Sequence, residues 1–304
     1  MKEIVIMPSK DVERMFAHLG DHSIDTSNIR RKFIDCPYGD APNQVLDVYV
    51  PDKGNGPFPI VFFAHGGAWS IGSKSDAQLL PFIDGINRGY AIISMNYRLV
   101  PEIRYPENLF DIKTALRWAA KKAEEYMLDP SRVALCGASA GAHLSLMAAF
   151  TQGQVVFDND ADAPSCRVLA VVEQFGPTDL AKIHVHFDES GFPRAQVPGE
   201  FSPQDALIGV RMEVVPNFMR FVNPLDNVHP NIPPVLIQHG IHDPVIPYQQ
   251  ATELHDKIIS VAGVGMAELD LYETFLHADP GYASAESVDR IFGFLDKHLH
   301  PATT

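Results

Sequence analysis

Three residues of this 304-residue chain have the types and the spacing required for acyl transfer through a serine. Ser139 is the central residue of GASAG, with glycines two positions before and two positions after it. A serine at the tip of a strained turn between a strand and a helix needs small neighbours, because the strand and the helix pack closely there. Asp243 and His277 each follow an apolar stretch further along the chain. The order Ser, Asp, His predicts a nucleophile, an orienting acid and a general base.

Each of these residues also has a simpler interpretation. GxSxG occurs by chance in ordinary strand-to-helix turns, Asp243 could cap a helix, and His277 is one of thirteen histidines. The competing candidates are Asp270, Asp279, His239 and His242. Asp243 and His277 are separated by 34 residues (277 minus 243), which is enough for one helix and one strand. Both side chains are therefore expected at the edge of the sheet where Ser139 lies.

A glycine-rich loop could supply the hydrogen-bond donors for an oxyanion. HGGAW, residues 65–69, follows the apolar stretch IVFFA, and its glycines would let backbone N–H groups face a developing negative charge. We assign these donors to Gly66, Gly67 and Ala140, and we expect His65 to support the loop by hydrogen bonding. A phosphate-binding loop is the alternative, but the spacings GxGxxG and GxxxxGK[ST] are both absent.

Two aromatic residues, Trp69 and Phe175, are candidates for lining a substrate pocket, although packing in the core explains each of them equally well. The pairs HVH (184–186) and HLH (298–300) lack further ligands at a spacing that suits a metal ion. We therefore expect neither a metal nor another cofactor.

The elements that would position these residues alternate between strands and helices. Apolar stretches ending in glycine or polar residues are typical of parallel strands covered on both faces. Such stretches lie at 58–67, 90–99, 132–136, 169–177, 233–240 and 267–275. Two earlier stretches, RRKFIDC and NQVLDVYVP, alternate as antiparallel strands do. Residues 108–126 and those after Ser139 have helical patterns, so we predict an α/β fold with a mostly parallel central sheet flanked by helices.

The chain length and composition predict a single domain over residues 1–304, because 46% hydrophobic and 20% charged residues can form one large core. Residues 1 to about 28 have the pattern of an amphipathic helical lead-in. Residues about 180–230 carry scattered prolines and aromatic residues without a strand pattern. An insertion of this length at the edge of a sheet predicts a lid over the site.

Charge and cysteine usage limit the partners. The net charge of −14 argues against nucleic acid and against an anionic membrane surface, which both require a positive patch. Three widely spaced cysteines predict free, buried thiols, and no apolar run approaches 18 residues, so we expect a cytoplasmic protein. The apolar C-terminal helix, with Ile291, Phe292, Phe294 and Leu295, could pack on its own sheet or on a second copy, which leaves a homo-oligomer open.

An ordered set of motifs resembles a known family. HGGAW, NYRL, GASAG, FGPTDL, HGIHDPVIPYQQA and HADPGY follow one another between Val45 and Leu299. Together they resemble α/β-hydrolase esterases of the hormone-sensitive-lipase-like branch, above all the bifunctional acetyl xylan and feruloyl esterases. The resemblance implies Ser139 as nucleophile, His277 as base and Asp243 as orienting acid, in agreement with the spacing. The segments SPQDALIG and NPLDNV resemble the part that such enzymes carry over their pocket.

Two positions depart from the family pattern. Ile241 stands where an acidic residue is common, and Ala278 stands where a glycine usually follows the histidine. Neither departure removes a catalytic group, but both lie on the side of the leaving group.

These observations predict a serine carboxylesterase that hydrolyses short-chain acyl or aromatic esters, of the acetyl or feruloyl type, through an acyl-enzyme. The expected partner is a small-molecule ester. A kynurenine-formamidase-like hydrolase is the alternative, because that family has a similar HGG and tryptophan loop. A non-catalytic binding protein of the same fold is a third hypothesis, and its hallmark would be a missing nucleophile, base or acid.

Overall fold

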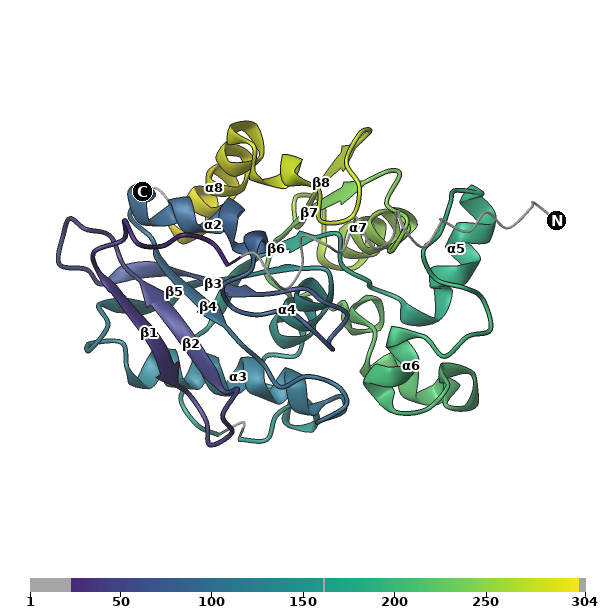
Figure 1. The fold of residues 1–304 in the computed structure, drawn as a ribbon, viewed down its shortest axis with the longest axis horizontal. Coiled ribbons are helices and arrows are strands. Elements are labelled where there is room, and N and C mark those ends of the chain that lie inside the picture. The colour runs from purple at the N-terminus through teal and green to yellow at the C-terminus, as the bar shows by residue number, and fades with distance from the viewer. Residues whose placement is uncertain (1–22, 161, 301–304) are drawn as a thin grey trace.

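One eight-stranded sheet forms the centre of the molecule (Figure 1). The structure is a computed structural model that describes residues 23–160 and 162–300. The strands are β1 (Lys32–Pro37), β2 (Val45–Tyr49), β3 (Phe58–Ala64), β4 (Ala91–Met95), β5 (Leu128–Ala138), β6 (Val168–Gln174), β7 (Val235–Gly240) and β8 (Ala267–Tyr272). Their order across the sheet is β1-β2-β4-β3-β5-β6-β7-β8, with β1 and β2 antiparallel to their neighbours and the rest parallel. This arrangement confirms the predicted fold class and the predicted antiparallel pair.

Helices cover both faces of the sheet. The α-helices are α2 (Leu80–Ile83), α3 (Glu107–Lys121), α4 (Ala140–Phe150), α5 (Ile183–Ser190), α6 (Pro203–Ile208), α7 (Gln249–Ala262) and α8 (Ala285–Leu299). The short 3₁₀ helices are η1 (Ala77–Leu79), η2 (Asp84–Arg88), η3 (Val155–Phe157), η4 (Leu180–Lys182), η5 (Met212–Val214), η6 (Pro216–Phe221), η7 (Pro224–Asn227) and η8 (Pro280–Ala283). Helices α3, α4 and α7 share one hydrophobic cluster with the sheet, and α2 and α8 share the other.

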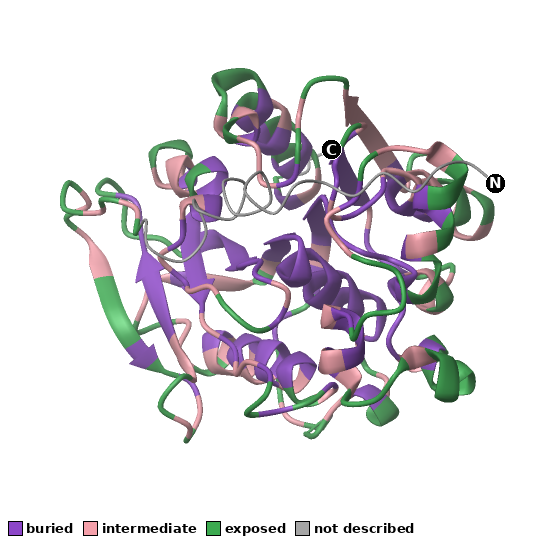
Figure 2. Cartoon of the chain, turned by 45° about the vertical axis from the view of Figure 1, so that its right-hand side comes forward, coloured by how far each residue is buried: buried purple, intermediate pink, exposed green. Residues whose placement is uncertain are grey.

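Burial on both faces explains the apolar strand sequences. All seven residues of β3, FPIVFFA, are buried, and all eleven residues of α4 are buried as well. Figure 2 shows the central strands and the helix beside them in the buried colour, whereas exposed residues lie at the periphery. A helix that is buried on every side needs small and apolar residues all round, as AGAHLSLMAAF provides.

The apolar side chains of α8 pack on the sheet of their own chain. Ile291, Phe292, Phe294 and Leu295 are at most 2% exposed and belong to the cluster that also contains Phe82 of α2. These side chains are therefore already covered within one chain, and a homo-oligomer stays a prediction.

The order of the strands positions the candidate site. The chain proceeds from β3 to β4 on one side and then returns to β5 on the other side of β3. Loops that leave the carboxyl ends of strands at such a reversal diverge and create a crevice. The glycine-rich loop after β3 and the turn after β5 therefore start side by side, with Ala64 paired to Gly137.

The segment 180–230 is composed of helices and 3₁₀ turns, from η4 to η7, between β6 and β7. Leu180, Leu207, Met219 and Val222 join the main hydrophobic cluster, so the segment packs on the body of the protein. Its role as a lid and the single-domain division stay predictions.

The predicted N-terminal lead-in falls mostly on residues 1–22, which lie outside the described part. Its last residues, 23–28, are not helical, contrary to the prediction. Ser23 forms an isolated bridge with Asp76, and the N–H of Ile24 donates to the carbonyl of Ser75 at 2.8 Å. The backbone of this stretch pairs with a loop, which replaces the hydrogen bonds that a helix would need.

Candidate active site

Ser139 lies at the tip of a sharp turn between β5 and α4. Its φ of 52° and ψ of −118° place it in a conformation that residues with a Cβ rarely adopt. The N–H of Ser139 donates to the carbonyl of Gln174 at 2.8 Å, which ties the turn to the end of β6. A Cβ on Gly141 would overlap the carbonyl oxygen of Ala64 in β3. Gly141, the last residue of GASAG, must therefore lack a side chain, because α4 approaches the sheet closely at this position.

A continuous chain of hydrogen bonds joins the three predicted catalytic side chains. The Oγ of Ser139 lies 3.0 Å from Nε2 of His277, and Nδ1 of His277 lies 2.7 Å from Oδ2 of Asp243. Because a carboxylate only accepts hydrogen bonds, Nδ1 carries the proton and Nε2 is left to accept from the serine. The three residues are 8%, 3% and 1% exposed, respectively. The structure therefore brings together residues that are up to 138 positions apart.

The Asp243 carboxylate is held by its own loop. Its Oδ1 accepts hydrogen bonds from the N–H groups of Val245 at 2.8 Å and Ile246 at 2.9 Å. The competing candidate His239 donates from Nε2 to the carbonyl of Ile246 at 2.9 Å. Burial lowers the pKa of His239, which keeps its ring neutral beside the acid. His239 therefore supports the loop of Asp243.

In the glycine-rich loop after β3, one of the three predicted oxyanion donors, the N–H of Gly66, already has a hydrogen-bond partner. The N–H of Gly66 donates to Oε1 of Gln78 at 2.7 Å, so this group is engaged within the protein. The next residues, Gly67 and Ala68, have φ values of 111° and 51°. Together with Ala140, they line the cavity that contains Ser139. Within residues 23–160 and 162–300, the N–H groups of these three residues have no hydrogen-bond acceptor.

His65 supports this loop, as the sequence predicted. Its Nδ1 donates to the carbonyl of Gly66 at 2.7 Å, and its ring stacks on Tyr97 with 4.5 Å between the ring centroids. The hydroxyl of Tyr97 donates to the carbonyl of His65 at 2.9 Å. Burial lowers the pKa of His65, so the ring stays neutral.

The cavity at Ser139 has a volume of about 150 Å³. Trp69 lines it, and Gln196 and Gln204 form part of its wall from the segment 180–230. The second aromatic candidate, Phe175, does not line this cavity. Its ring instead meets the ring of His277 edge to face, at 4.8 Å between centroids, and lines a separate cavity. Phe175 is thus a packing partner of the candidate base.

Two residues at the site escaped the sequence analysis. Gln78, which binds the Gly66 N–H, lies 12 positions further along in a stretch without a recognisable pattern. Glu173 lies inside β6, is fully buried, and accepts a hydrogen bond from the N–H of Gly176 through Oε1. Burial, with a smaller contribution from the charge of Asp243, raises the pKa of Glu173 to about 8. The only sign of Glu173 in the sequence was a single acidic residue within an apolar strand, and this pattern did not indicate what the residue does.

The described residues offer neither a cluster of metal ligands nor a membrane-spanning helix. They contain no group of three histidine, cysteine or acidic side chains that could hold a metal ion. Over the same residues, every helix is too short or too polar to cross a lipid bilayer.

Comparisons with known proteins identify relatives. Esterase LipC of Mycobacterium tuberculosis is 31% identical over 239 residues, which cover 76% of this chain and 57% of LipC. The isoprenylcysteine alpha-carbonyl methylesterase ICME of Arabidopsis thaliana is 27% identical over 258 residues, covering 84% of this chain and 57% of that protein. This chain therefore spans somewhat more than half the length of these relatives.

A solved structure shares the fold. The truncated form of a carbohydrate esterase from gut microbiota superimposes with a TM-score of 0.77 at 24% identity, over 91% of this chain and 99% of that one. The profile of the BD-FAE family matches residues 46–258, a region that contains Ser139 and Asp243. The chain therefore belongs to the BD-FAE family of α/β-hydrolase esterases, as the order of its motifs predicted.

Proposed function

We propose that this protein is a serine carboxylesterase that hydrolyses esters of short acyl groups through an acyl-enzyme. The observation that carries the proposal is the chain of hydrogen bonds from Ser139 through His277 to Asp243, at 3.0 and 2.7 Å, in the wall of a cavity. All three parts of the triad are present, which argues against a non-catalytic binding protein. Membership of the BD-FAE family supports the same chemistry.

In the proposed mechanism, Nε2 of His277 takes the hydroxyl proton of Ser139 as its Oγ attacks the ester carbonyl. Asp243 accepts from Nδ1 of His277 and stabilises the imidazolium that forms. His277 then passes the proton to the leaving alcohol, which leaves the acyl group on Ser139. A water molecule deprotonated by His277 attacks the acyl-enzyme, and the acid is released.

The tetrahedral oxyanion is proposed to bind the N–H groups of Gly67, Ala68 and Ala140. All three line the cavity with Ser139 and lack an acceptor within the described residues. Gly66 contributes indirectly, because the hydrogen bond from its N–H to Gln78 fixes the loop that carries Gly67 and Ala68. Donors that are held in place before the reaction cost no reorganisation during it.

The volume of the cavity supports a small acyl group. A cavity of about 150 Å³ beside Ser139 has room for an acetyl or butyryl group. Among the two acyl classes predicted from the sequence, the short one is therefore proposed here.

A reducing, cytoplasmic location is proposed on the basis of the cysteines. Cys36, Cys136 and Cys166 are all free and buried, as the sequence predicted. Proteins of oxidising compartments commonly pair such residues in disulfides.

A turnover panel tests the proposal. We expect acetyl and butyryl esters to be hydrolysed with a higher kcat/KM than feruloyl esters, and Ser139→Ala to lower kcat by roughly 10⁶-fold. N-formylkynurenine belongs in the panel, because a strong preference for this formamide would overturn the substrate assignment while leaving the triad intact. A Ser139→Ala variant that keeps most of the activity would remove the serine from the mechanism.

A further inference from the structure

Two glutamine side chains in the wall of the cavity at Ser139 have no hydrogen-bond partner in the protein. Gln196 and Gln204 both line this cavity, and Gln204 is only 2% exposed. The Oε1 atom of each is buried and unpaired, and neither side chain makes a hydrogen bond to any residue within 23–160 and 162–300. A buried amide in this state costs free energy, because it loses its hydrogen bonds to water and gains none in return.

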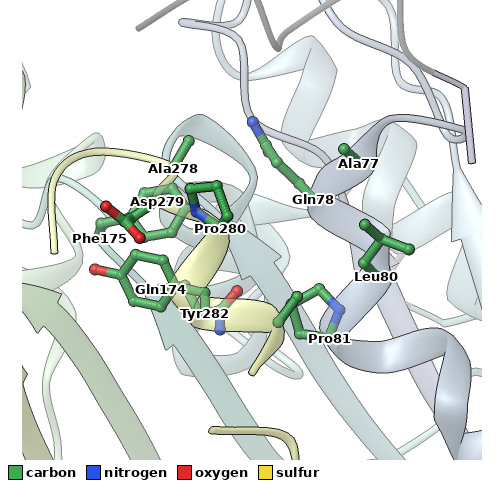
Figure 3. A pocket seen from close by; sticks show the side chains of 11 residues that line it. Ala77, Gln78, Leu80, Pro81, Gln174, Phe175, Ala278, Asp279, Pro280 and Tyr282 are labelled. Atoms are coloured by element: carbon green, nitrogen blue, oxygen red, sulfur yellow. The ribbon is translucent and has the colours of Figure 1, made fainter. Parts of the chain in front are cut away.

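The other eight glutamines of the chain are hydrogen-bonded through their side chains. They are Gln44, Gln78, Gln152, Gln154, Gln174, Gln238, Gln249 and Gln250. Gln78 and Gln174 line a second cavity of about 240 Å³, which contains neither Ser139 nor His277 (Figure 3). There Gln78 accepts from the N–H of Gly66, and Gln174 donates to Gln238. Among the described residues, the glutamine side chains without a hydrogen bond are therefore the two that line the cavity at the nucleophile.

Backbone contacts hold both of these glutamines in place. Gln204 is the second residue of α6, whose first turn is closed by a capping box. Gln196 follows Ala195, whose N–H donates at 2.7 Å to the carbonyl of Pro244, the residue after Asp243. The terminal torsion of a glutamine side chain is soft, so its amide can turn either its oxygen or its NH₂ group towards a ligand while the backbone stays fixed.

The wall of this cavity offers neutral hydrogen-bonding groups. The described residues that line it include no lysine, arginine, aspartate or glutamate. Trp69 also lines the cavity, and its Nε1–H is buried without an acceptor in the described part of the chain. An amide both donates and accepts, and an indole donates. A charged substrate group would find no counter-charge here, whereas a hydroxyl group, which donates and accepts, matches these side chains.

We infer that Gln204 and Gln196 select esters that place a hydroxyl group in the cavity at Ser139, with the Nε1–H of Trp69 as a further donor. This inference rests on the proposed esterase function and adds a feature that the preferred substrate must carry. The hydroxyl belongs either to a short acyl group or to the alcohol, because both are attached to the carbonyl that Ser139 attacks. An ester with a methyl group in its place leaves the buried amides unpaired, and this difference provides the selectivity.

Two pairs of esters, in which a methyl group replaces a hydroxyl group, test the inference. Methyl 3-hydroxybutanoate is compared with methyl 3-methylbutanoate for the acyl side, and 2-hydroxyethyl acetate with propyl acetate for the alcohol side. Each kcat/KM is divided by the rate constant of hydrolysis by hydroxide, which removes differences in intrinsic reactivity. We expect at least about a tenfold preference for the hydroxyl in one pair or both, which identifies the half of the ester concerned. Equal values in both pairs, in an active enzyme, overturn the inference and leave the proposed function standing, because water alone then serves the amides.

Two variants remove the hydrogen-bonding groups and keep the length of the side chain. Gln204→Met and Gln196→Met are expected to lower kcat/KM for the preferred hydroxylated ester and to leave its methyl counterpart within about twofold, so that the ratio approaches one. Gln154→Met is the matched control, because Gln154 lies outside the cavity and donates to the carbonyl of Phe150 at 3.2 Å. It is expected to keep the ratio of the wild type. An unchanged ratio in both folded cavity variants contradicts the inference.

Urea unfolding shows that each variant is folded and adds a readout that is independent of turnover. Gln204→Met is expected to unfold at the same urea concentration as the wild type or at a higher one, because it no longer buries an unpaired amide. A lower midpoint would mean that Gln204 supports the fold, and this would contradict a role reserved for the substrate.

A binding measurement separates the failure of this inference from the failure of the proposed function. Titration calorimetry with both hydroxylated esters and their methyl counterparts is carried out on Ser139→Ala, with and without Gln204→Met. We expect one hydroxylated ester to bind more tightly than its counterpart, and the difference to disappear when Gln204→Met is added. If the wild type hydrolyses no ester, the proposed function fails, and this titration still decides whether the cavity selects a hydroxyl. Equal affinities within both pairs, or no binding of either hydroxylated ester, overturn the inference.

Discussion

Replacing Glu173 with glutamine is expected to make the protein more stable at alkaline pH relative to the wild type. Glu173 is fully buried in β6, and its Oε2 has no hydrogen-bond partner among the described residues. Burial raises the pKa of this carboxyl from 4.5 to about 8. Glutamine preserves an oxygen that can accept the N–H of Gly176, but it cannot ionise.

The sign of the effect follows from proton binding. Between pH 4.5 and about 8, the folded state keeps the proton on Glu173 while the unfolded state releases it. The free energy of unfolding of the wild type therefore falls as the pH rises through this window. A pKa displaced from 4.5 to about 8 corresponds to a loss of roughly 5 kcal/mol by pH 8, as an upper bound. The Glu173→Gln variant lacks this loss.

The assay is urea unfolding at several pH values from 5 to 8.5, with the difference in unfolding free energy between variant and wild type as the readout. Taking the difference in unfolding free energy at each pH removes the contributions of other titrating groups, because they are the same in both proteins. The cost of burying the glutamine amide does not depend on pH, so it shifts this difference by a constant amount. We expect the difference to grow by several kcal/mol across the window. The exposed Glu124, changed to glutamine, is the control and is expected to give parallel curves. Parallel curves for Glu173→Gln would refute the reasoning, because they would mean that Glu173 is ionised in the folded protein.

Three further predictions follow from the site and the core. Asp243→Asn is expected to lower kcat by about 10⁴-fold in steady-state ester hydrolysis, because an amide cannot hold the required tautomer of His277, and a loss below tenfold would contradict this role. Gly141→Ala is expected to destabilise the fold by about 1–3 kcal/mol in urea unfolding, since its Cβ would overlap the carbonyl of Ala64, and an unchanged midpoint would disprove the close approach. The thiols of Cys36, Cys136 and Cys166 are at most 7% exposed, and burial raises the pKa of each, so Ellman's reagent is expected to label them only after unfolding; rapid labelling of the folded protein would count against this.

Much of the fold could be predicted, because both faces of the central sheet are covered. Strands in such a sheet are continuous apolar runs, and β3 to β8 each fall within a stretch recognised from its composition or directly overlap it. The alternating stretches RRKFIDC and NQVLDVYVP correctly indicated β1 and β2, although only the edge strand β1 is largely exposed and β2 is buried except at Val45. The association of Ser139, Asp243 and His277 could be predicted because parallel strands end at a common edge.

Other features depended on contacts that leave no local pattern. The side chain of Gln78 captures the N–H of Gly66, and this contact changes which N–H groups face the cavity. Phe175 has a φ of 44°, and its ring meets the ring of His277, neither of which the sequence reveals. Residues 23–28 have a pattern compatible with a helix, but pairing with the loop at Ser75 determines their conformation. Such tertiary interactions override local propensity.

The most direct test of the account is covalent trapping of the nucleophile with a fluorophosphonate, followed by peptide mass spectrometry. The account predicts one label per chain on the peptide that contains Ser139, no label in Ser139→Ala, and strongly slowed labelling in His277→Ala, because the base activates the hydroxyl over 3.0 Å. A label on another residue, or labelling of His277→Ala at the rate of the wild type, would contradict it.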